Sequence, residues 1–218
     1  MTTILHLRCS PRGAAAFSSR MAEEVVARLL DHHYNSAEIV FHDLSAYPPP
    51  LVDAAFSAAI LGPPGETPPA LEVSEALIRE LEAADVVVIA TPMHNYCVPA
   101  VLKAWVDQIV RIHRTFASTP SGKVGKLRDR PVWLIVASGG WFTGPSPSGA
   151  PAQPDFLTPY MRAVLNTIGI HDLHVLALEG VTRGADIADA AIGRARAALD
   201  RSLPLALPRE VLDRGPPS

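Results

Sequence analysis

The residues best suited to chemistry stand in "TPMHNYCVPA", residues 91–100, directly after the apolar run "DVVVIA". Asn95 carries an amide that both donates and accepts hydrogen bonds, and its neighbours Met93, His94 and Tyr96 are flat or polarizable. Such a set suits a planar heteroaromatic ring with imide edges. The alternative is a turn whose apolar side chains only cover the end of a strand.

Two other loops carry groups that bind ligands. "CSPRGAAAFSS", residues 9–19, offers the hydroxyls of Ser10, Ser18 and Ser19 ahead of a helical stretch. Hydroxyls and free amides at a helix start can hold a phosphate, although such serines can also merely cap the helix. "SGG", residues 138–140, would let backbone N–H groups approach a ligand closely or would form a plain turn.

Several other chemistries find little support. Neither G-x-G-x-x-G nor G-x-x-x-x-G-K-[ST] is present, which argues against a dinucleotide or nucleoside-triphosphate loop. The pairs His32–His33 and His171–His174 lack a cluster of carboxylates or thiolates, so no metal site is expected. "GPSPSG" is not a G-x-S-x-G elbow, and no Asp…His order follows it.

Composition limits the setting. Over 218 residues the net charge is −3 and the basic residues are scattered, so no nucleic-acid footprint is visible. No apolar run is long enough to cross a bilayer, and no signal pattern opens the chain. Two cysteines give neither a disulfide framework nor a metal spacing, so we expect a reduced, cytoplasmic protein.

The elements that would position these loops alternate along the chain. Short apolar runs predict strands over residues 3–8, 38–44, 85–90, 130–140 and 173–180. Apolar residues at helical spacing predict helices over residues 18–33, 74–85, 99–112, 155–170 and 185–203. Ser18 or Ser19 is expected to cap the first helix and Ser74 the second. Residues 51–70 and 141–154 are read as segments with little regular structure.

This alternation predicts one α/β domain over residues 1–203, followed by a proline-rich, frayed tail over 204–218. Right-handed crossovers favour a doubly wound, five-stranded parallel sheet covered by helices on both faces. Ligands in that architecture bind outside the carboxyl ends of the strands. The loops after the first, third and fourth strands, which are the three loops described above, would meet there.

The chain also resembles a known family. "TPMHNYCVPAVLKAWVDQIVR.HRTF" is similar to the P-M-Y-N-F…L-K…D…R…T-F segment of the FMN-dependent NADH azoreductases, which are flavodoxin-like, three-layer quinone reductases. "FHDLSAYPPPLVD" resembles their R-D-L…P-x-P segment, and "LTPYMRAVLNTIGIHDLHVLALEGVTRG" resembles their T-P-Y-L…F-x-G-I…EG segment. The resemblance covers roughly residues 3–200.

The resemblance implies a position for each part of FMN. The phosphate would lie on Ser10 and the turn of Ala16, Phe17 and Ser18. The isoalloxazine ring would lie against Met93, His94, Asn95 and Tyr96, and against the turn of Ala137, Ser138, Gly139 and Gly140. Ala16, His94 and Ala137 stand where the family has Ser, Tyr and Ser, so we expect FMN binding to be weaker but not lost.

The resemblance further implies that NADH or NADPH donates two electrons, which pass in ping-pong fashion to quinones, azo compounds or similar small acceptors. Asn95 would stabilise negative charge on the ring, and His94 would either protonate the acceptor or only pack. A two-fold homodimer is expected, with Trp105, Phe116, Trp141 and Phe142 as exposed aromatics suited to an interface. The alternative function is a non-catalytic module of the same fold that binds flavin or another ligand.

Overall fold

The structure is a computed structural model and describes residues 2–32, 37–62 and 68–203. The tail expected to be frayed, residues 204–218, lies outside the described residues. No helix among the described residues is long and apolar enough to cross a membrane.

A five-stranded sheet forms the centre of the fold. Its strands lie in the order β2-β1-β3-β6-β7, and every neighbouring pair is parallel. The strands are β1 (Thr2–Arg8), β2 (Ala37–Asp43), β3 (Val86–Pro92), β6 (Val132–Ser138) and β7 (Leu173–Glu179). The central strands β3 and β6 are almost continuously apolar because both of their faces are buried. The predicted sheet is confirmed.

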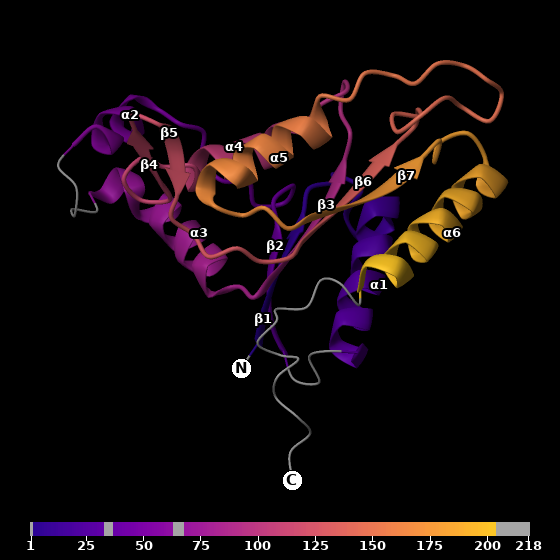
Figure 1. Ribbon diagram of the computed structural model, residues 1–218, viewed down its shortest axis with the longest axis horizontal. Coiled ribbons are helices and arrows are strands. Elements are labelled where there is room, and N and C mark those ends of the chain that lie inside the picture. Colours follow the sequence, from indigo (N-terminus) through magenta and orange to yellow (C-terminus); the bar gives the residue numbers. More distant parts are fainter. Residues whose placement is uncertain (1, 33–36, 63–67, 204–218) are drawn as a thin grey trace, which may run out of the picture.

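Helices cover both faces of this sheet, as Figure 1 shows. Helices α1 (Phe17–His32) and α6 (Ala185–Ser202) pack on one face. Helices α3 (Glu72–Ala83), α4 (Ala100–Ile109) and α5 (Leu157–Ile168) pack on the other. Within β3, Val87 and Ile89 belong to the second of these cores, whereas Val86 and Val88 belong to the first. This alternation gives the three-layer arrangement expected of a doubly wound fold.

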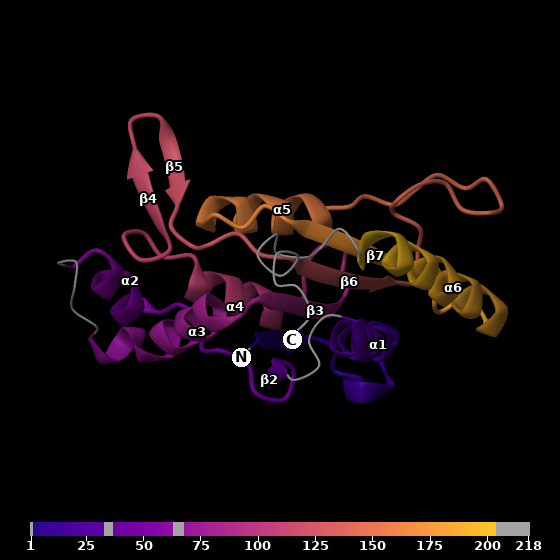
Figure 2. The same cartoon turned by 60° about the horizontal axis from the view of Figure 1, so that its bottom comes forward.

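Some regular structure was not predicted. A short helix, α2 (Ala54–Ile60), lies in the segment read as irregular, and the Asp53 carboxylate caps it by accepting from the Phe56 N–H at 2.7 Å. An antiparallel hairpin, β4 (Phe116–Thr119) and β5 (Gly122–Gly125), stands out from the body in Figure 2. Two 3-10 turns, η1 (Gly13–Ala15) and η2 (Pro69–Leu71), precede α1 and α3.

Two predicted caps are wrong. Helix α1 begins at Phe17, so Ser18 and Ser19 lie inside its first turn rather than before it. Helix α3 begins at Glu72, because η2 leads directly into it. Ser74 is therefore buried within the helix, where its hydroxyl donates to the backbone oxygen of Gln108.

The expected exposure of aromatic residues is also mostly wrong. Trp105, Phe116 and Phe142 are buried. Trp105 faces the core because it falls on the apolar stripe of α4 together with Leu102, Val106 and Ile109. Only Trp141 is partly exposed.

Candidate functional site

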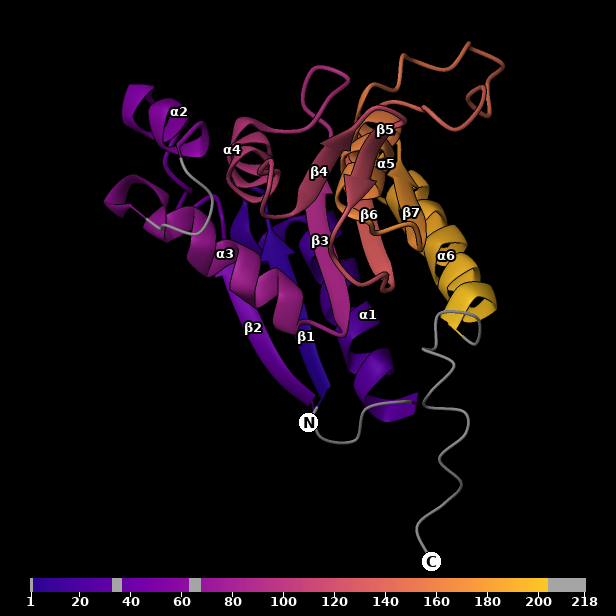
Figure 3. The same cartoon turned by 60° about the vertical axis from the view of Figure 1, so that its left-hand side comes forward.

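Three loops meet at one edge of the sheet. Strands β1, β3 and β6 are neighbours, so the loops that follow them leave the sheet side by side at its carboxyl end. In Figure 3 the loop after β3 and the long loop after β6 rise from this same end. These are the loops in which the sequence predicted a ligand site.

A first cavity, of about 170 Å³, lies between these loops. Most of the predicted positions line it, namely Ser10, Ala16, Phe17, Ser18, Met93, Ala137 and Gly139. Arg12, Pro92, Val181 and Thr182 complete the lining. The sequence predicts that the loops after β1, β3 and β6 contact one ligand, and in the fold residues of all three loops line one cavity.

The end of the first cavity near α1 is rich in donors. Backbone N–H groups in the first turn of a helix have no partner inside the helix, and none of Phe17, Ser18 and Ser19 finds a backbone acceptor among the described residues. The Ser10 hydroxyl accepts from the Arg12 N–H at 3.3 Å. Since Arg12 also lines the cavity and no Asp or Glu does, this end favours an anion.

Cys9 lies just below this end without taking part in its chemistry. Its side chain is fully buried, and its N–H donates to the Ala90 oxygen at 2.8 Å. Burial raises the pKa of the Cys9 thiol far above its usual range. The group therefore stays a neutral thiol and is a poor nucleophile.

The loop after β3 makes a tight turn. The His94 N–H donates to the Cys97 oxygen at 3.0 Å, and the Cys97 N–H donates back to the His94 oxygen at 2.9 Å. Asn95 and Tyr96, the two residues between them, have φ values of 48° and 69°. Two consecutive left-handed residues are typical of a type I′ turn and are unfavourable for side chains other than Gly, Asn or Asp.

The side chains of this turn do not form the wall of the first cavity. His94, Asn95 and Tyr96 are exposed, and none of them is among the residues that line the first cavity. Pro92 and Met93 are the residues of the quoted stretch that do line it. The turn stands at the cavity's margin, where its side chains could meet a ligand extending out of the sheet edge.

The loop after β6 brings in Gln153, which the sequence did not suggest. The Ser138 hydroxyl accepts from the Gly140 N–H at 3.1 Å and from Gln153 Nε2 at 2.9 Å. Gln153 Nε2 also lies 3.1 Å from Met93 Sδ. A Cβ at Gly140 would lie 2.1 Å from Gln153 Oε1, and one at Gly139 would lie 2.7 Å from Thr182 Oγ1. A side chain at either glycine would therefore require Gln153 or Thr182 to shift.

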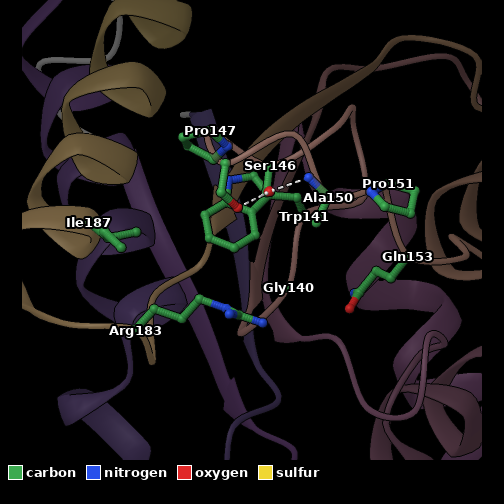
Figure 4. Close-up of a pocket in the computed structure, with 10 residues that line it drawn as sticks. Gly140, Trp141, Ser146, Pro147, Ala150, Pro151, Gln153, Arg183 and Ile187 are labelled. Carbon is green, nitrogen blue, oxygen red and sulfur yellow. Dashed lines mark hydrogen bonds between the residues drawn. The ribbon is translucent and has the colours of Figure 1, made fainter.

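A second, larger cavity of about 470 Å³ adjoins the first (Figure 4). Gly139 lines the first cavity and Gly140 lines the second, so the two share the turn after β6. The remaining wall comes from the 141–153 loop, the segment before α6 and the start of α6: Trp141, Ser146, Pro147, Ser148, Ala150, Pro151, Gln153, Arg183 and Ile187.

Sequence reasoning missed Arg12, Gln153, Thr182 and Arg183. Arg12 could have been found, because it is the one basic residue within the quoted serine loop, residues 9–19. Gln153 offers no such signal, since it lies in a long loop without periodicity. No group of three or more His, Cys, Asp or Glu residues suited to a metal ion occurs in residues 2–32, 37–62 and 68–203.

Comparisons with known proteins agree with this geometry. Residues 2–203 match the Flavodoxin_2 family, which is described as a flavodoxin-like fold. The chain is 45% identical over 199 residues to FMN-dependent NADH:quinone oxidoreductase 4 of Pseudomonas fluorescens, covering 91% of this chain and 94% of that one. It is 43% identical to FMN-dependent NADH:quinone oxidoreductase 2 of Cupriavidus pinatubonensis, covering 85% and 90% of the two chains.

Solved structures show the same fold at lower identity. The crystal structure of an FMN-dependent NADH-azoreductase from Bacillus anthracis in complex with FMN superimposes with a TM-score of 0.77 at 23% identity. The match covers 95% of this chain and 100% of that one. With the fold, the site at its carboxyl edge and relatives of over 40% identity in hand, the chain belongs to the flavodoxin-like family of FMN-dependent NADH:quinone oxidoreductases.

Proposed function

We propose that this protein binds FMN and uses NADH or NADPH to reduce quinones, azo compounds or similar small acceptors by two electrons. The observation that carries the proposal is the first cavity, which joins a donor-rich helix start to the β3 and β6 loops. Relatives that share over 40% of their residues with this chain are named for FMN, NADH and quinone.

The donor-rich end fits the FMN phosphate. Ser10 and Ser18 supply hydroxyls, and the first turn of α1 supplies unpaired N–H groups and the positive end of the helix dipole. Ala16 lacks the hydroxyl found there in the azoreductases. Arg12 lines the same cavity and adds a positive charge, which would offset that loss.

The other end fits the isoalloxazine ring. Met93, Ala137 and Gly139 would form its wall, with the turn at residues 94–97 beside it. The Asn95 amide and the N–H groups of Gly139 and Gly140 would stabilise negative charge at the ring's pyrimidine edge. Ser138 would help to hold this turn, since its hydroxyl accepts from the Gly140 N–H.

FMN, when bound, supplies the chemistry of accepting hydride and passing on electrons. The chain's task is then to hold the ring, keep one ring face open and stabilise charge. The nicotinamide and the acceptor would use the same open face in turn, which gives ping-pong kinetics. Two roles remain proposed for the exposed His94, protonation of the acceptor or packing beside the ring; Tyr96 would flank the ring from the same turn.

A single experiment tests the proposal. Purified protein should carry about one FMN per chain, and NADH should bleach its yellow absorption under anaerobic conditions. A quinone added afterwards should restore the colour. If FMN is bound but NADH never bleaches it, the reductase proposal fails and a flavin-binding module without catalysis takes its place.

We further propose that residues 1–203 form one domain with 204–218 as a tail, and that the protein is a cytoplasmic homodimer. The family match over residues 2–203 supports the single domain. Cys9 and Cys97 are both free thiols, in keeping with a reducing compartment. Large apolar side chains exposed at the carboxyl end of the sheet, among them Tyr47 and Phe156, support an interface between two copies.

A further inference from the structure

Hydrogen bonds within the protein hold the wall of the second cavity in place without a ligand. The buried Glu179 carboxylate accepts from the Phe142 N–H at 2.7 Å, the Thr143 N–H at 2.8 Å and the Thr143 hydroxyl at 2.9 Å. Further along, the Gln153 N–H donates to the Trp141 oxygen at 2.7 Å. The first end of the loop is thus tied to β7, and its two ends are tied to each other.

The tip of this loop is closed on itself. The Ser146 N–H donates to the Ala150 oxygen at 2.8 Å, and the Ala150 N–H donates to the Ser146 hydroxyl at 3.0 Å. The hydroxyls of Ser146 and Ser148 lie 2.9 Å apart. A loop with this many internal bonds holds a defined concave surface, which is the usual form of a small-molecule site.

Trp141 is fixed in this surface by a glycine. Gly180 has a φ of 73°, and a Cβ placed on it would lie 2.8 Å from the Trp141 ring and 2.9 Å from Ile187. Only glycine therefore lets the indole and Ile187 pack over this point. The result is a rigid aromatic and apolar wall beside the shared turn.

Arg183 brings a positive charge to the same cavity. Its guanidinium carbon lies 5.1 Å from the centre of the Trp141 ring, and its Nε donates to the Gly139 oxygen at 3.1 Å. Figure 4 shows the side chain extending from the segment before α6 toward Gly140. Arg183 makes no ion pair with the described residues, so its remaining N–H donors are available to an anion.

We propose that the second cavity binds the adenosine diphosphate end of the reduced dinucleotide, with Arg183 on the diphosphate and the Trp141 wall against the adenine. The inference rests on the proposed function. The second cavity's volume of about 470 Å³ falls in the range of about 300–1,000 Å³ typical of small-molecule sites. Because the cavity begins at the turn beside the ring site, a nicotinamide at the ring would place the diphosphate toward Arg183.

The charge of the wall favours this occupant over the acceptor. Quinones are flat but usually uncharged, whereas a dinucleotide joins a flat base to a diphosphate. The diphosphate would contact Arg183 while the adenine contacts Trp141. An acceptor that carries its own anionic group, such as a sulfonated naphthoquinone, shares this chemistry and has to be separated by experiment.

ADP-ribose is a suitable probe, since it keeps the adenosine diphosphate end and lacks the nicotinamide. Its binding to the FMN-loaded protein is measured by calorimetry for the wild type, Arg183→Gln and Arg183→Lys. The control is Arg194→Gln, because Arg194 is also exposed but lies within α6 and does not line the cavity. We expect about tenfold weaker binding for Arg183→Gln, an intermediate value for Arg183→Lys and no change for the control. Raising the salt concentration should reduce the difference.

Two results would overturn the inference. The first is no binding of ADP-ribose to the wild type, and the second is equal affinity for ADP-ribose in the wild type and Arg183→Gln. In the second case, a higher KM of Arg183→Gln for a sulfonated naphthoquinone would assign the cavity to the acceptor. NADH bleaching of the wild type is scored separately, so failure of the proposed function and failure of this inference remain distinguishable.

Discussion

Ser18 offers the most direct test of the phosphate end of the first cavity. Its side chain lines that cavity at the start of α1. A hydrogen bond to a charged group contributes about 1.5–3 kcal/mol, so Ser18→Ala should weaken FMN binding by about tenfold to a hundredfold. Ser10→Ala should act in the same direction. Fluorescence titration of the apoprotein with FMN measures both.

The matched control is Ser121→Ala, in the exposed turn of the hairpin. It should bind FMN like the wild type. Arg12→Gln should also weaken FMN binding, and more so at low salt, because Arg12 acts through its charge. Unchanged FMN affinity in Ser10→Ala, Ser18→Ala and Arg12→Gln together would reject a phosphate at this helix start.

Asn95 has both a conformational and a chemical role, which two substitutions separate. Its φ of 48° is tolerated by Asn and Gly but disfavours Ala by about 1 kcal/mol. Asn95→Ala and Asn95→Gly both remove the amide, so both should slow NADH bleaching about tenfold. Only Asn95→Ala should also lower the melting temperature, by about 2–4 °C.

Stopped-flow bleaching and thermal melts, each on FMN-loaded protein, measure the two effects. FMN affinity should change less than the bleaching rate in both variants, since Asn95 lies at the margin of the cavity. If NADH bleaches the FMN of Asn95→Gly at the wild-type rate, the role of Asn95 is only to form the turn.

Much of the first cavity could be predicted at the level of residues. Ser10, Met93 and Gly139 follow the ends of three strands, and parallel strands end at one edge of a sheet. Gln153 could not be predicted, because its contact with Met93 and Ser138 depends on how a long loop folds back. The backbone conformation of the Asn95 turn was equally hidden, since "HNYC" carries no glycine.

At the scale of elements, Glu75 ties α3 to the chain that follows α4. Its buried carboxylate accepts hydrogen bonds from Arg114 at 3.0 and 3.1 Å and from Arg111 at 3.4 Å. Hydrogen bonds from Arg114 hold the pKa of Glu75 below its ordinary value, and the charges of Arg111 and Arg79 add to the effect. The network thus holds the C-terminal end of α4, whose other end follows the 94–97 turn.

Glu75→Gln should therefore destabilise the fold in a pH-dependent way. A carboxyl whose pKa is lower in the folded state stabilises it above the unfolded pKa, about 4.3, and this is lost as the pH falls through the folded value. At pH 7 we expect a loss of about 2 kcal/mol, or about 4–8 °C in melting temperature. Near pH 3 the difference in melting temperature between Glu75→Gln and the wild type should be smaller.

Melting curves at both pH values test this, with Glu23→Gln as the control, because Glu23 is exposed on α1. That control should melt like the wild type throughout. A gap for Glu75→Gln that stays constant with pH would show that the Glu75 charge contributes nothing to stability.

The elements that could be predicted are those with a buried face. Helices α1, α3, α4, α5 and α6 show apolar residues at helical spacing because one side packs on the sheet. The hairpin β4–β5 has little of this pattern: Lys123 and Val124 are exposed, and only Phe116 is buried. Helix α2 likewise buries one side chain, Phe56. Elements that bury so little leave no periodic signal.

At the scale of the whole molecule, several large apolar side chains are exposed on the loops at the carboxyl end of the sheet. Tyr47 is 84% exposed, Leu51 77% and Phe156 61%. Phe156 adjoins the 94–97 turn, because its N–H donates to the Tyr96 oxygen at 2.9 Å. The 45–52 segment packs near α4 through the Gln108 side chain, which donates to the Pro50 oxygen at 2.8 Å. Such side chains are what a partner copy would cover.

We therefore expect a two-fold homodimer whose interface includes Phe156. Light scattering at micromolar concentration should give twice the chain mass of 23.3 kDa. Phe156→Asp places a charge where apolar contact is expected, so it should shift the protein toward the monomer and slow NADH bleaching if the partner helps to enclose the ring. Ile39→Asp is the control, because Ile39 is also partly exposed but lies in the middle of β2, away from the carboxyl edge. A wild-type protein that is monomeric in light scattering and whose FMN is still bleached by NADH would contradict the dimer. It would also show that the cavity of a single chain is sufficient for the reaction.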